Sequence, residues 1–548
     1  MPIKSEHPDV PIVNQPFYSR VIAKITEHHL ASPGRAAFIN AENPSDRVTW
    51  LQLLDFSSSL ANFFRQRGFG KEQVCCLVLP NCWQYAVGFL GATLAGGAIS
   101  GASAMFTDYE LGRQFTDSQA TCVITDETHL GRVLTAVASA PKIQTIICIR
   151  SSSNPLPQGV QDFKQCVSGS TKFVPDERSF SPDNLLLLPY SSGTTGSPKG
   201  VMLTHRNFGT MTDVVMSNFY NVIYPDVLPD YVPAKENTLL LLPFYHIYGF
   251  GMLMRSLFEG TTGIIFGKFD PVLLCEKIQE HKVQQLFVVP PIVIFLAKHP
   301  VVAKYDISSI RMMFSGAAPC GKDIIDELMN KHKHIRFFGQ GYGMTECGMV
   351  SHLPVPRAKS TISAGRLAAN FEQMIIDLKS GKECKRGERG EIWVKGPTVM
   401  KGYLNRTEAT AETIDKDQWL HTGDIGYLDK DGNLFVVDRL KELIKVKGLQ
   451  VPPAELEDLL LSHPRVRDAA VIGIPDSRTG EAPKAFIVAA DDKLKAQDIV
   501  NFVKQKVSSY KQLTGGVEFV DEIPKAPSGK ILRRLLRDAE QQKMKSKL

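Results

Sequence analysis

One hydroxyl-rich segment of the chain has the composition of a phosphate-binding loop. Residues Tyr190–Gly200 contain three serines, two threonines, three glycines and Lys199. Glycines let backbone N–H groups close around an anion, hydroxyls donate hydrogen bonds, and a lysine adds positive charge. We expect the phosphate contacts from Ser191, Ser192, Gly193, Thr194, Thr195 and Lys199. The alternative, a plain polar hairpin turn, requires neither the lysine nor Pro198.

The same loop does not have the Walker A spacing. That pattern needs a glycine, four residues, and then Gly-Lys-Ser/Thr. Counting from Gly193, the second glycine position holds Pro198, and Lys199 is followed by Gly200. The P-loop GTPase and kinase classes therefore lose support.

A second polar segment, Gln340–Glu346, places an aromatic residue between two glycines. Tyr342 has the freedom there to present its ring to a nucleotide base. Thr345 is a candidate donor to a phosphate oxygen, and Glu346 is a candidate Mg²⁺ ligand. Taken alone, a tyrosine between glycines is also typical of a simple turn.

Two short carboxylate- and lysine-bearing segments follow. Asp424 ends Leu420–Asp424, where a carboxylate held in a tight turn can accept both hydroxyls of a ribose; an Asx turn is the alternative. Farther on, Asp438–Gly448 contains lysines at 441, 445 and 447 around an apolar dipeptide. That segment is either an ordinary surface face or a hinge whose two sides present different lysines.

Two further residues stand out by their surroundings. Lys530 lies at the tip of a Pro/Gly loop, Pro524–Lys530, from which it could reach the cleft of another domain. The alternative is an exposed loop lysine. His246 lies among aromatic residues and close to Gly249 and Gly251, which favours a pocket wall over a core histidine.

The elements that would position these residues indicate an α/β protein of more than one domain. The chain has 548 residues, too many for one core, with 43% hydrophobic and 22% charged residues and a formal charge of +6. This modest charge does not indicate a nucleic-acid partner. Apolar strand-like runs alternate with helical patterns over 49–180 and again over 184–363, which predicts two doubly wound parallel sheets. Strands are expected at Gln73–Pro80, Thr121–Thr125 and Thr145–Arg150, and an amphipathic helix at Tyr18–His29.

The pattern changes after residue 364. Short β-like runs separated by Gly, Asp and Asn turns predict a small β-barrel or a meander up to residue 437. We expect residues 1–437 to form the N-terminal domain, with ATP and acid sites, and residues 438–548 a smaller α+β domain. The basic tail is expected to be a solvated helix face rather than a nucleic-acid arm. In the small domain we expect a helix at Pro453–Leu461, strands at Asp468–Ile474 and Ala482–Ala490, and a helix at Ala496–Ser509.

Location signals are few. The N-terminus has no apolar signal region, and the uncharged stretch Asn81–Thr107 reads as a buried helix, turn and strand rather than a transmembrane segment. The ten cysteines show no metal-binding spacing and are expected to be buried thiols. The final tripeptide, Ser546–Leu548, has the sequence of a peroxisomal address read by an import receptor.

The motifs occur together, and in the same order, in one family. The loop 190–200, the Gly-Tyr-Gly-Met-Thr-Glu run, Thr-Gly-Asp, Asp-Arg-Leu-Lys-Glu-Leu-Ile-Lys and Pro-Ser-Gly-Lys resemble the adenylate-forming (ANL) superfamily over about residues 20–540. The chain looks most like 4-coumarate–CoA ligase and firefly luciferase. This resemblance implies a large AMP-binding domain, a mobile C-terminal domain, and the cofactors ATP, Mg²⁺ and coenzyme A. The implied reaction forms an acyl-adenylate and then transfers the acyl group to CoA.

The resemblance also implies roles for the residues named above. Lys530 would bridge the α-phosphate and the carboxylate, offsetting their repulsion in a water-poor cleft. The other implied catalytic residues are His246, Thr345 and Lys445. The ATP or AMP set adds Gln340, Gly341, Tyr342, Asp424, Arg439 and Lys441; the CoA set is Lys268, Lys447 and Gly448; the acyl pocket includes Tyr248, Phe314 and Ala317; and Glu346 would hold Mg²⁺.

The identity of the acid stays open. Met252 and Phe314 are bulky and apolar, which favours a fatty or other hydrophobic acid, including an aryl-propenoic one, over a hydroxylated aromatic acid. Ile247, Tyr248 and Met349 differ from luciferase, which disfavours light emission. The remaining alternatives are a luciferase-like monooxygenase, a ligase specific for 4-coumarate, and a non-catalytic protein that only binds AMP or lipid.

Overall fold

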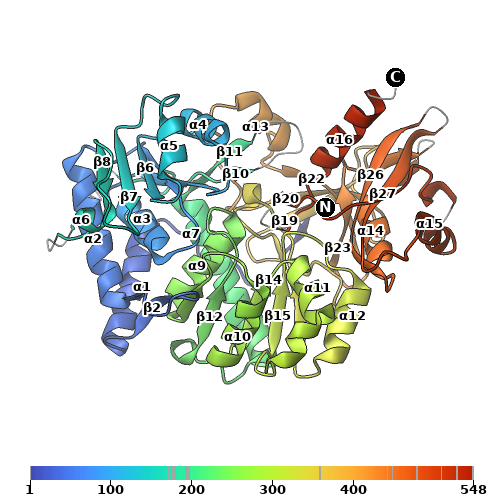
Figure 1. Ribbon diagram of the computed structural model, residues 1–548, viewed down its shortest axis with the longest axis horizontal. Helices are drawn as coiled ribbons and strands as arrows, with labels where there is room; N and C mark the ends of the chain where they lie inside the picture. The colour runs from blue at the N-terminus through green and yellow to red at the C-terminus, as the bar shows by residue number, and fades with distance from the viewer. Residues whose placement is uncertain are drawn as a thin grey trace.

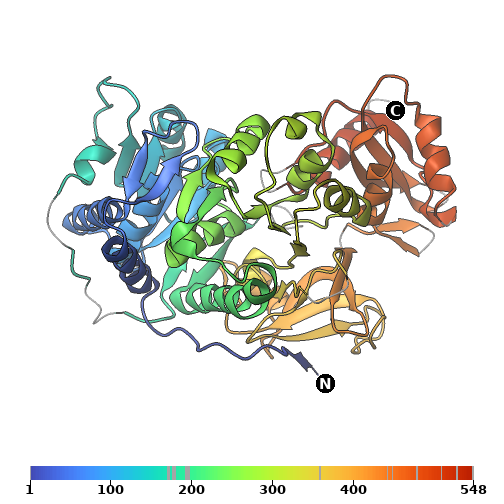
Figure 2. The same cartoon turned by 90° about the horizontal axis from the view of Figure 1, so that it is seen from below.

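The computed structural model describes residues 2–169, 173–175, 180–191, 198–356, 360–440, 442–446, 449–476, 479–507, 509–525 and 529–545. A large N-terminal part carries a smaller C-terminal domain on one side (Figures 1 and 2). Residues 192–197, 441, 447, 448 and 546–548 are outside the described residues, so the predictions made for them are not addressed by the structure.

The first sheet contains a parallel core with helices packed on it. Its strand order is β10-β11-β9-β5-β4-β6-β7-β8, with β21 beside β11. The strands predicted at Gln73–Pro80, Thr121–Thr125 and Thr145–Arg150 are confirmed as β4, β6 and β7. The bounds of the sheet strands are β4 Val74–Val78, β5 Ala98–Ala102, β6 Cys122–Asp126, β7 Thr145–Ile149, β8 Val160–Asp162, β9 Leu185–Leu187, β10 Tyr190–Ser191, β11 Lys199–Thr204 and β21 Gly402–Tyr403. Its helices are α2 Trp50–Gln66, α3 Trp83–Leu94, α4 Asp108–Asp117, α5 Leu130–Val137 and α6 Phe163–Cys166.

The uncharged stretch 81–107 is confirmed as a buried helix, turn and strand. Helix α3 is followed by a turn at Gly96 and Gly97 and then by β5, every residue of which is buried. A Cβ on Gly97 would lie 2.5 Å from the Phe69 ring, so only glycine fits this turn. Among the described residues, no helix has both the length and the apolar character that crossing a bilayer requires.

The second subdomain joins distant parts of the chain. Strands β12, β13 and β2 pair in parallel, β3 pairs antiparallel to β2, and a neighbouring parallel sheet has the order β14-β15-β16. Strands β2 and β3, which follow the predicted helix at Tyr18–His29, were not predicted from the sequence. The strand bounds are β2 Ala36–Asn40, β3 Arg47–Thr49, β12 Asn237–Leu240, β13 Thr262–Ile265, β14 Gln285–Val288, β15 Met312–Ser315 and β16 Phe337–Gln340.

Helices cover these sheets and join them to the first subdomain. The predicted amphipathic helix is confirmed as α1, which runs from Phe17 to Ala31 and buries one face. Helices α7 and α9 lie between the two sheet systems. The helix bounds are α1 Phe17–Ala31, α7 His205–Asn218, η2 Phe219–Ile223, α8 Tyr224–Val227, α9 Ile247–Glu259, α10 Pro271–His281, α11 Pro290–Lys298 and α12 Lys322–Lys331.

The β-rich segment after residue 364 is a meander, not a closed barrel. Strands β19, β20, β22 and β23 follow one another antiparallel, and β1 from the N-terminus extends the sheet beyond β19. In the described strands, β1 and β23 are therefore its two edges, and Figure 2 shows the N-terminus beside this sheet. The bounds are β1 Ile3–Lys4, β17 His352–Leu353, β18 Arg366–Leu367, β19 Glu372–Ile376, β20 Gly390–Lys395, α13 Thr407–Thr413, β22 Leu420–Leu428 and β23 Leu434–Arg439.

The C-terminal domain has its own hydrophobic core, which begins at Ile444. The predicted helix at Pro453–Leu461 and both predicted strands are confirmed, as α14, β26 and β27. The predicted helix at 496–509 is shorter, because α15 ends at Lys504. The bounds are β24 Ile444–Val446, β25 Leu449–Val451, α14 Pro453–Leu461, β26 Val466–Asp476, β27 Gly480–Ala489, α15 Ala496–Lys504, β28 Gly516–Phe519 and α16 Arg533–Lys545.

Two expectations about side chains have different outcomes. All ten cysteines are free and eight are buried, as predicted. The basic tail is a helix, α16, but Arg533 is not solvated: it is 9% exposed and forms ion pairs with Glu457, at 2.6 Å, and with Glu442. This arginine therefore ties α16 to the rest of the small domain.

Candidate functional site

Lys530 reaches from the small domain into the large one. The preceding residue, Gly529, has a positive φ of 80°, and a Cβ there would lie 3.2 Å from Pro291 at the start of α11. The pKa of Lys530 is lowered to about 8. Burial is the main cause and Arg439 contributes, while the carboxylates of Glu442 and Asp424 oppose the shift. The structure thus brings the predicted Lys530 together with the predicted Asp424 and Arg439.

Asp424 is held ready as a hydrogen-bond acceptor. It pairs with Arg439 across the β22–β23 ladder, with Arg439 Nε 3.2 Å from its Oδ1. The Tyr342 hydroxyl donates to its Oδ2 at 2.7 Å. Burial raises the pKa of Asp424, while Arg439 and the Tyr342 hydroxyl oppose this effect. Three predicted nucleotide residues, which lie far apart in the sequence, therefore meet in one buried cluster.

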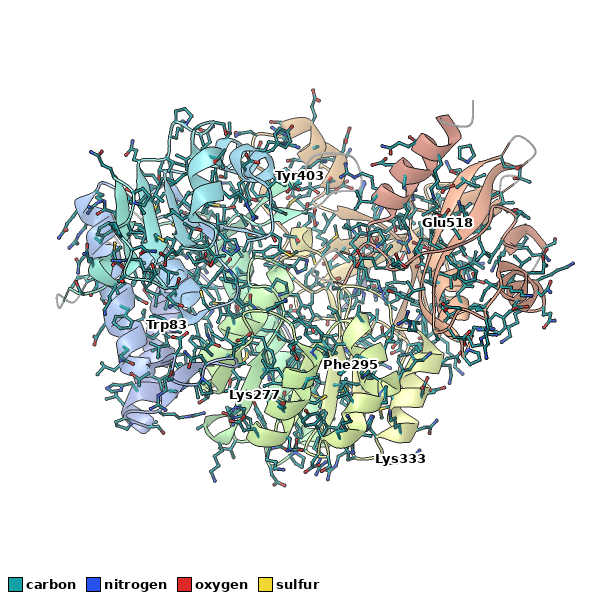
Figure 3. All side chains as sticks on the ribbon, viewed as in Figure 1. Trp83, Lys277, Phe295, Lys333, Tyr403 and Glu518 are labelled. Atoms are coloured by element: carbon teal, nitrogen blue, oxygen red, sulfur yellow. The ribbon has the colours of Figure 1, made fainter. Side chains whose placement is uncertain are left out.

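Glu346 forms a second cluster with the described ends of the hydroxyl-rich loop. Its Oε1 accepts hydrogen bonds from the Ser191 hydroxyl at 3.0 Å and from the Tyr403 hydroxyl at 2.9 Å. The Lys199 ammonium lies over the Tyr403 ring, 4.9 Å from its centroid. Tyr403 is labelled in Figure 3 and was not singled out from the sequence.

The loop between Ser191 and Lys199 is the connection of a β-hairpin. Ser191 and Lys199 are paired directly across β10 and β11. This hairpin base fixes one hydroxyl and one lysine at the two ends of the loop, beside Glu346. The predicted residues Ser192, Gly193, Thr194 and Thr195 lie outside the described residues.

His246 caps the helix that leads away from this cleft. Its Nδ1 accepts a hydrogen bond from the Tyr248 backbone N–H at 3.3 Å, at the N-cap of α9. The pKa of His246 is lowered to about 4, mainly by burial and also by the charge of Lys530. The imidazole is therefore neutral near pH 7, and with Nδ1 accepting, the proton is placed on Nε2.

Two of the predicted acyl residues, Tyr248 and Phe314, approach the glycines that follow β15 and β16. A Cβ on Gly316 would lie 3.1 Å from the Tyr248 ring, and one on Gly341 would lie 3.1 Å from the Phe314 ring. Ala317, just after Gly316, has a left-handed φ of 69° and an exposed side chain. The chain thus turns sharply after β15, next to the Tyr248 ring.

Gln340, Gly341 and Thr345 occupy the rest of this loop region. The Gln340 amide accepts from Cys320 N–H at 2.8 Å and donates to the carbonyls of Cys320 and Thr361, so both its amide hydrogens are already engaged within the protein. Its side chain therefore links β16 to the segments around Cys320 and Thr361. Thr345 opens the short η5 helix, Thr345–Cys347, and is 9% exposed.

The predicted CoA-side residues are not gathered here. Lys445 is exposed on β24, where its backbone N–H donates to Glu481 at 2.6 Å. Lys268 is exposed beyond β13, where its backbone N–H donates to Glu42 at 3.1 Å. Lys441, Lys447 and Gly448 lie outside the described residues. The structure thus assembles the residues predicted for the first half-reaction and leaves Lys445 facing solvent.

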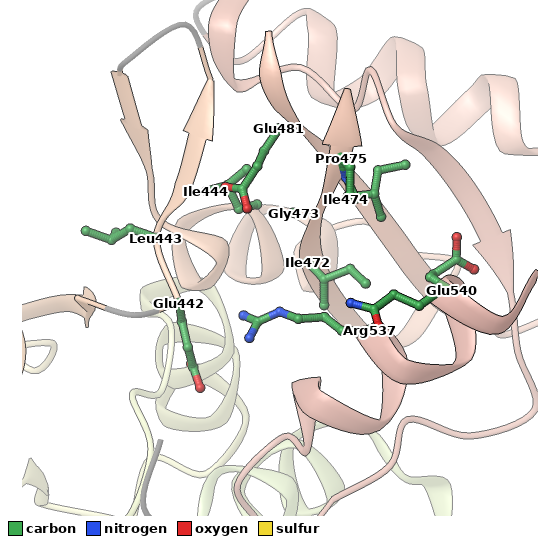
Figure 4. A pocket seen from close by; sticks show the side chains of 11 residues that line it. Glu442, Leu443, Ile444, Ile472, Gly473, Ile474, Pro475, Glu481, Arg537 and Glu540 are labelled. Carbon is green, nitrogen blue, oxygen red and sulfur yellow. The ribbon is translucent and has the colours of Figure 1, made fainter. Parts of the chain in front are cut away.

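A separate pocket lies within the small domain, between β24, β26 and α16. Its volume is about 210 Å³, and Figure 4 shows Arg537 extending from α16 toward Glu442. None of the residues predicted for ATP lines it. We therefore place the candidate active site at the Lys530 cluster, between the two domains.

The sequence analysis missed a buried polar cluster in the large domain. Arg255 is 3% exposed on α9 and forms an ion pair with Glu259 at 2.9 Å. The signal was present, because a charge pair interrupts an otherwise apolar helix. The other partners are Tyr224, Tyr231 and Gln285.

A two-domain α/β fold with a lysine carried from the small domain to a carboxylate–arginine–tyrosine cluster is the arrangement of an adenylate-forming enzyme. Comparison with known families agrees: residues 26–404 match the AMP-binding enzyme family, and residues 455–530 match the AMP-binding enzyme C-terminal domain. The chain belongs to the AMP-binding enzyme family.

Individual relatives narrow the reaction. The chain is 40% identical to 4-coumarate–CoA ligase 2 of Nicotiana tabacum over 97% of this chain and 96% of that protein. It is 39% identical to 4-coumarate–CoA ligase 1 of Arabidopsis thaliana over 97% and 94%. ATP-bound MatB from Rhodopseudomonas palustris has a TM-score of 0.82 at 25% identity, covering 96% of this chain and 99% of that one. An anthranilate–CoA ligase in complex with anthranoyl-AMP superposes with a TM-score of 0.85 at 23% identity, covering 98% and 99%, which supports the fold. The protein is an adenylate-forming acyl- or aryl-CoA ligase, an acid–thiol ligase.

Proposed function

We propose that the protein activates a hydrophobic carboxylic acid with MgATP at the Lys530 cluster and then transfers the acyl group to coenzyme A. A carboxylate oxygen attacks the α-phosphorus, the bond to the β-phosphate breaks, and pyrophosphate leaves. The thiol sulfur of CoA then attacks the acyl carbon, AMP leaves with the former carboxylate oxygen, and the thiol proton is released. The observation that carries the proposal is the burial of Lys530 beside Asp424, Arg439 and His246.

In the first step, Lys530 would offset the repulsion between the two anions. Its burial strengthens this effect, because a charge acts more strongly where water is excluded. Asp424, fixed by Arg439 and Tyr342, would accept the ribose hydroxyls, and Tyr342 would stack on the base. Thr345, Ser191, Lys199 and the hydroxyl loop would hold the phosphates, and the neutral His246 would donate from Nε2.

Glu346 fits a single protein ligand for Mg²⁺. Magnesium in nucleotide sites keeps several waters and uses one or two carboxylates together with phosphate oxygens. Ser191 and Tyr403 both donate to Glu346 Oε1, which orients the carboxylate beside Lys199. Bound there, Mg²⁺ would neutralise phosphate charge.

The second step would need a different arrangement of the small domain. Lys445 is exposed, whereas Lys530 is half-buried beside Asp424 and Arg439, so the two lysines have different surroundings in this conformation. We propose that the small domain rotates near the predicted boundary at residue 438, bringing Lys445 and Gly448 to the cleft. Lys268 and Lys447 would then meet CoA.

The acid is proposed to be hydrophobic, either fatty or aryl-propenoic. Met252 and Phe314 are buried at 6% and 5% exposure, and Tyr248 and Ala317 lie on the same side of the cleft. The named relatives are 4-coumarate–CoA ligases, so 4-coumarate belongs in any substrate panel.

The test is pyrophosphate release by the full chain with ATP, Mg²⁺ and a panel of fatty, aryl-propenoic and short acids. We expect release that depends on the acid, and a CoA thioester detected by mass after CoA is added. A protein that binds AMP or lipid without catalysis would bind but release no pyrophosphate with any acid. A luciferase-like enzyme would instead consume oxygen after forming the adenylate.

A peroxisomal location stays a prediction. It is supported by the Ser546–Leu548 tripeptide alone, and those residues lie outside the described part of the chain. A fluorescent protein fused to the N-terminus of the full chain should accumulate in peroxisomes and become diffuse when the tripeptide is removed. A fusion that is diffuse with the tripeptide intact would remove the link to peroxisomal fatty-acid metabolism.

A further inference from the structure

Helix α9 runs from the catalytic cleft to the buried polar cluster. His246 caps its N-terminus, and Tyr248, Gly251 and Arg255 follow at spacings of three and four residues, which places them on one face of the helix. A Cβ at Gly251 would lie 2.2 Å from the Met349 sulfur, so the missing side chain makes room for Met349. This face of α9 therefore runs from His246 at the cleft to Arg255, with Met349 packed against it at Gly251.

A small cavity of about 10 Å³, room for about one water molecule, lies between α7 and α9. Most of its wall is apolar, and Arg255 is its charged residue. The lining residues are Phe208, Met211, Thr212, Val215, Met216, Gly251, Arg255 and Met349. Because methionine is unbranched and flexible, Met349 and Met216 can move to admit a longer chain. An otherwise apolar pocket thus ends at a guanidinium group.

Most of the Arg255 guanidinium is already fixed by the protein. Its carbon lies 4.7 Å from the Phe219 ring centroid and 4.5 Å from that of Phe287. Its Nη2 donates to Glu259 at 2.9 Å and to Gln285 at 3.1 Å, and also bonds the Tyr224 hydroxyl. The guanidinium group is therefore held rigidly, and its Nε–H bond keeps a fixed direction.

The Nε–H of Arg255 is buried and has no hydrogen-bond partner among the described residues. The Tyr248 hydroxyl, on the same helix face, is likewise buried without one, and so are both amide atoms of Asn218, which precedes Phe219. Buried donors without partners are unfavourable, and they are rare in folded proteins. Such a group at the wall of a substrate pocket points to an acceptor that the bound substrate supplies.

We propose that Arg255 is a specificity-determining residue whose Nε–H donates to a neutral oxygen acceptor near the distal end of the acid. This inference rests on the proposed function, because it assigns a substrate class to that same site. The class is a hydrophobic carboxylic acid with a carbonyl, hydroxyl or ether oxygen far from the carboxylate. An acid that lacks the oxygen leaves the donor unpaired and is disfavoured for that reason.

The negative charge of Glu259 favours a neutral acceptor on the substrate over a charged one. Its carboxylate already pairs with Arg255 at 2.9 Å and also accepts from the hydroxyls of Tyr224 and Tyr231, each at 3.1 Å. A second carboxylate on the substrate would bring a net negative charge into this buried cluster. We therefore expect a dicarboxylic acid to be a poorer substrate than a ketone of the same length.

The length of α9 limits the length of the acid. From Ile247 to Arg255 the helix rises about 12 Å, at about 1.5 Å per residue. An extended chain of roughly eight to ten carbon atoms covers this distance, since each C–C bond of about 1.5 Å advances by less than its full length. The oxygen is thus expected close to the end of a medium-length chain.

The test compares matched acids in the pyrophosphate assay. Octanoate, decanoate and dodecanoate are each compared with the methyl-ketone analogue, which carries a carbonyl on the penultimate carbon, and with the dicarboxylate of equal length. For at least one length, we expect kcat/KM to favour the ketone over the plain acid by about tenfold. Equal rates at every length, or a preference for the dicarboxylate, would overturn the inference while leaving the ligase function intact. No pyrophosphate with any acid, aryl-propenoates included, would instead overturn the proposed function, and the inference with it.

Two variants separate recognition from folding. Arg255→Lys keeps the positive charge beside Glu259 but lacks Nε, and the double variant Arg255→Met with Glu259→Gln removes both charges together, so that neither is left alone. Both should retain activity with the plain acid and lose the preference for the ketone. A preference that persists in both variants would contradict the inference.

Arg20 provides a matched control. It pairs with Asp213 at 2.5 Å and lies over Phe258 of the same helix α9, 5.4 Å from the ring centroid, but it does not line the cavity. Arg20→Met should leave the ketone preference unchanged. Loss of the preference in this variant would show a general effect on α9 and would count against Arg255 as the recognising group.

Discussion

The nucleotide end and the acid end of the site are built in different ways. Around Asp424, polar side chains from β22, β23, the loop after β16 and the small domain converge, and Tyr342, Arg439 and Lys530 come from segments far apart in the sequence. At the acid end, two helices, α7 and α9, supply nearly the whole wall, and one buried ion pair interrupts it. A site that handles a constant ligand is assembled from polar loops, whereas the site that selects the acid is shaped by helix packing.

This difference predicts how each end responds to substitution. At the nucleotide end, each residue meets charge that forms in the reaction, so its loss should slow the reaction with every acid. At the acid end, a substitution should change which acid is used and leave the use of ATP unchanged. The variants below, from the largest expected effect to the smallest, test this contrast.

Lys530→Ala should give the largest effect. Removing a placed charge at the reacting atoms typically costs about 10²–10³ in rate, and we expect a loss of about 10³-fold in CoA thioester formation with every acid. Steady-state thioester formation measures it. Lys525→Ala is the control, since Lys525 lies in the same segment but pairs with Asp468 at 2.6 Å. A loss limited to some acids would remove the contrast between the two ends.

Asp424→Ala should act mainly through ATP. It leaves Arg439 and the Tyr342 hydroxyl without their carboxylate partner, and hydrogen bonds to a charged group are worth about 1.5–3 kcal/mol, so the KM for ATP should rise roughly 10–100-fold. The KM for the acid should change little. Asp431→Ala, at an exposed position in the β22–β23 turn, is the control. An unchanged KM for ATP would mean that Asp424 does not contact the nucleotide.

Gly251→Ala should affect the acid end alone. The new Cβ would lie 2.2 Å from the Met349 sulfur and push that side chain into the cavity. We expect kcat/KM to fall about tenfold for medium-length acids and little for short ones, with the KM for ATP unchanged. Gly131→Ala is the control, because a Cβ there meets nothing within 4 Å. An equal loss with acids of every length would place Gly251 outside the acid path.

The pH dependence should show the smallest effect. Burial lowers the pKa of Lys530 to about 8, so the lysine is charged below that pH and becomes neutral above it. With subsaturating ATP, kcat/KM should therefore decline severalfold as pH rises through about 8, while His246, with a pKa of about 4, stays neutral throughout. Lys530→Arg, whose guanidinium keeps its charge, should remove the decline even if the rate is lower. A wild-type profile that stays flat above this pH would contradict a cationic role for Lys530.

The sequence predicted the nucleotide end better than the acid end, for physical reasons. Polar residues between glycines at the ends of strands, as at Tyr342 and Asp424, have few structural explanations, and their order along the chain is informative. The strand pairs of β4 to β7 also follow from local patterns. The pairing of β2 with β13 does not, because it joins residues about 225 positions apart, as Phe38 and Gly263 show, and hydrophobic periodicity carries no information on distant partners.

The residues that the sequence analysis missed can be recognised only from their contacts in the folded structure. Tyr403 lies beside Glu346 because β21 pairs with β11, and Arg255 was hidden in an apolar helix whose inner face is not apparent before folding. Of the barrel and the meander that the sequence left open, the structure has the meander, with β1 from the N-terminus at one edge.

The most direct test of the central claim measures the two half-reactions separately in Lys530→Ala and Lys445→Ala. Lys530 is half-buried beside Asp424 and Arg439 and Lys445 is exposed, so each is expected to serve one step only. Lys530→Ala should lose acid-dependent pyrophosphate release yet convert supplied acyl-adenylate and CoA to thioester at close to the wild-type rate, and Lys445→Ala should show the reverse. If Lys530→Ala lost both half-reactions equally, the assignment of this lysine to adenylate formation would be contradicted.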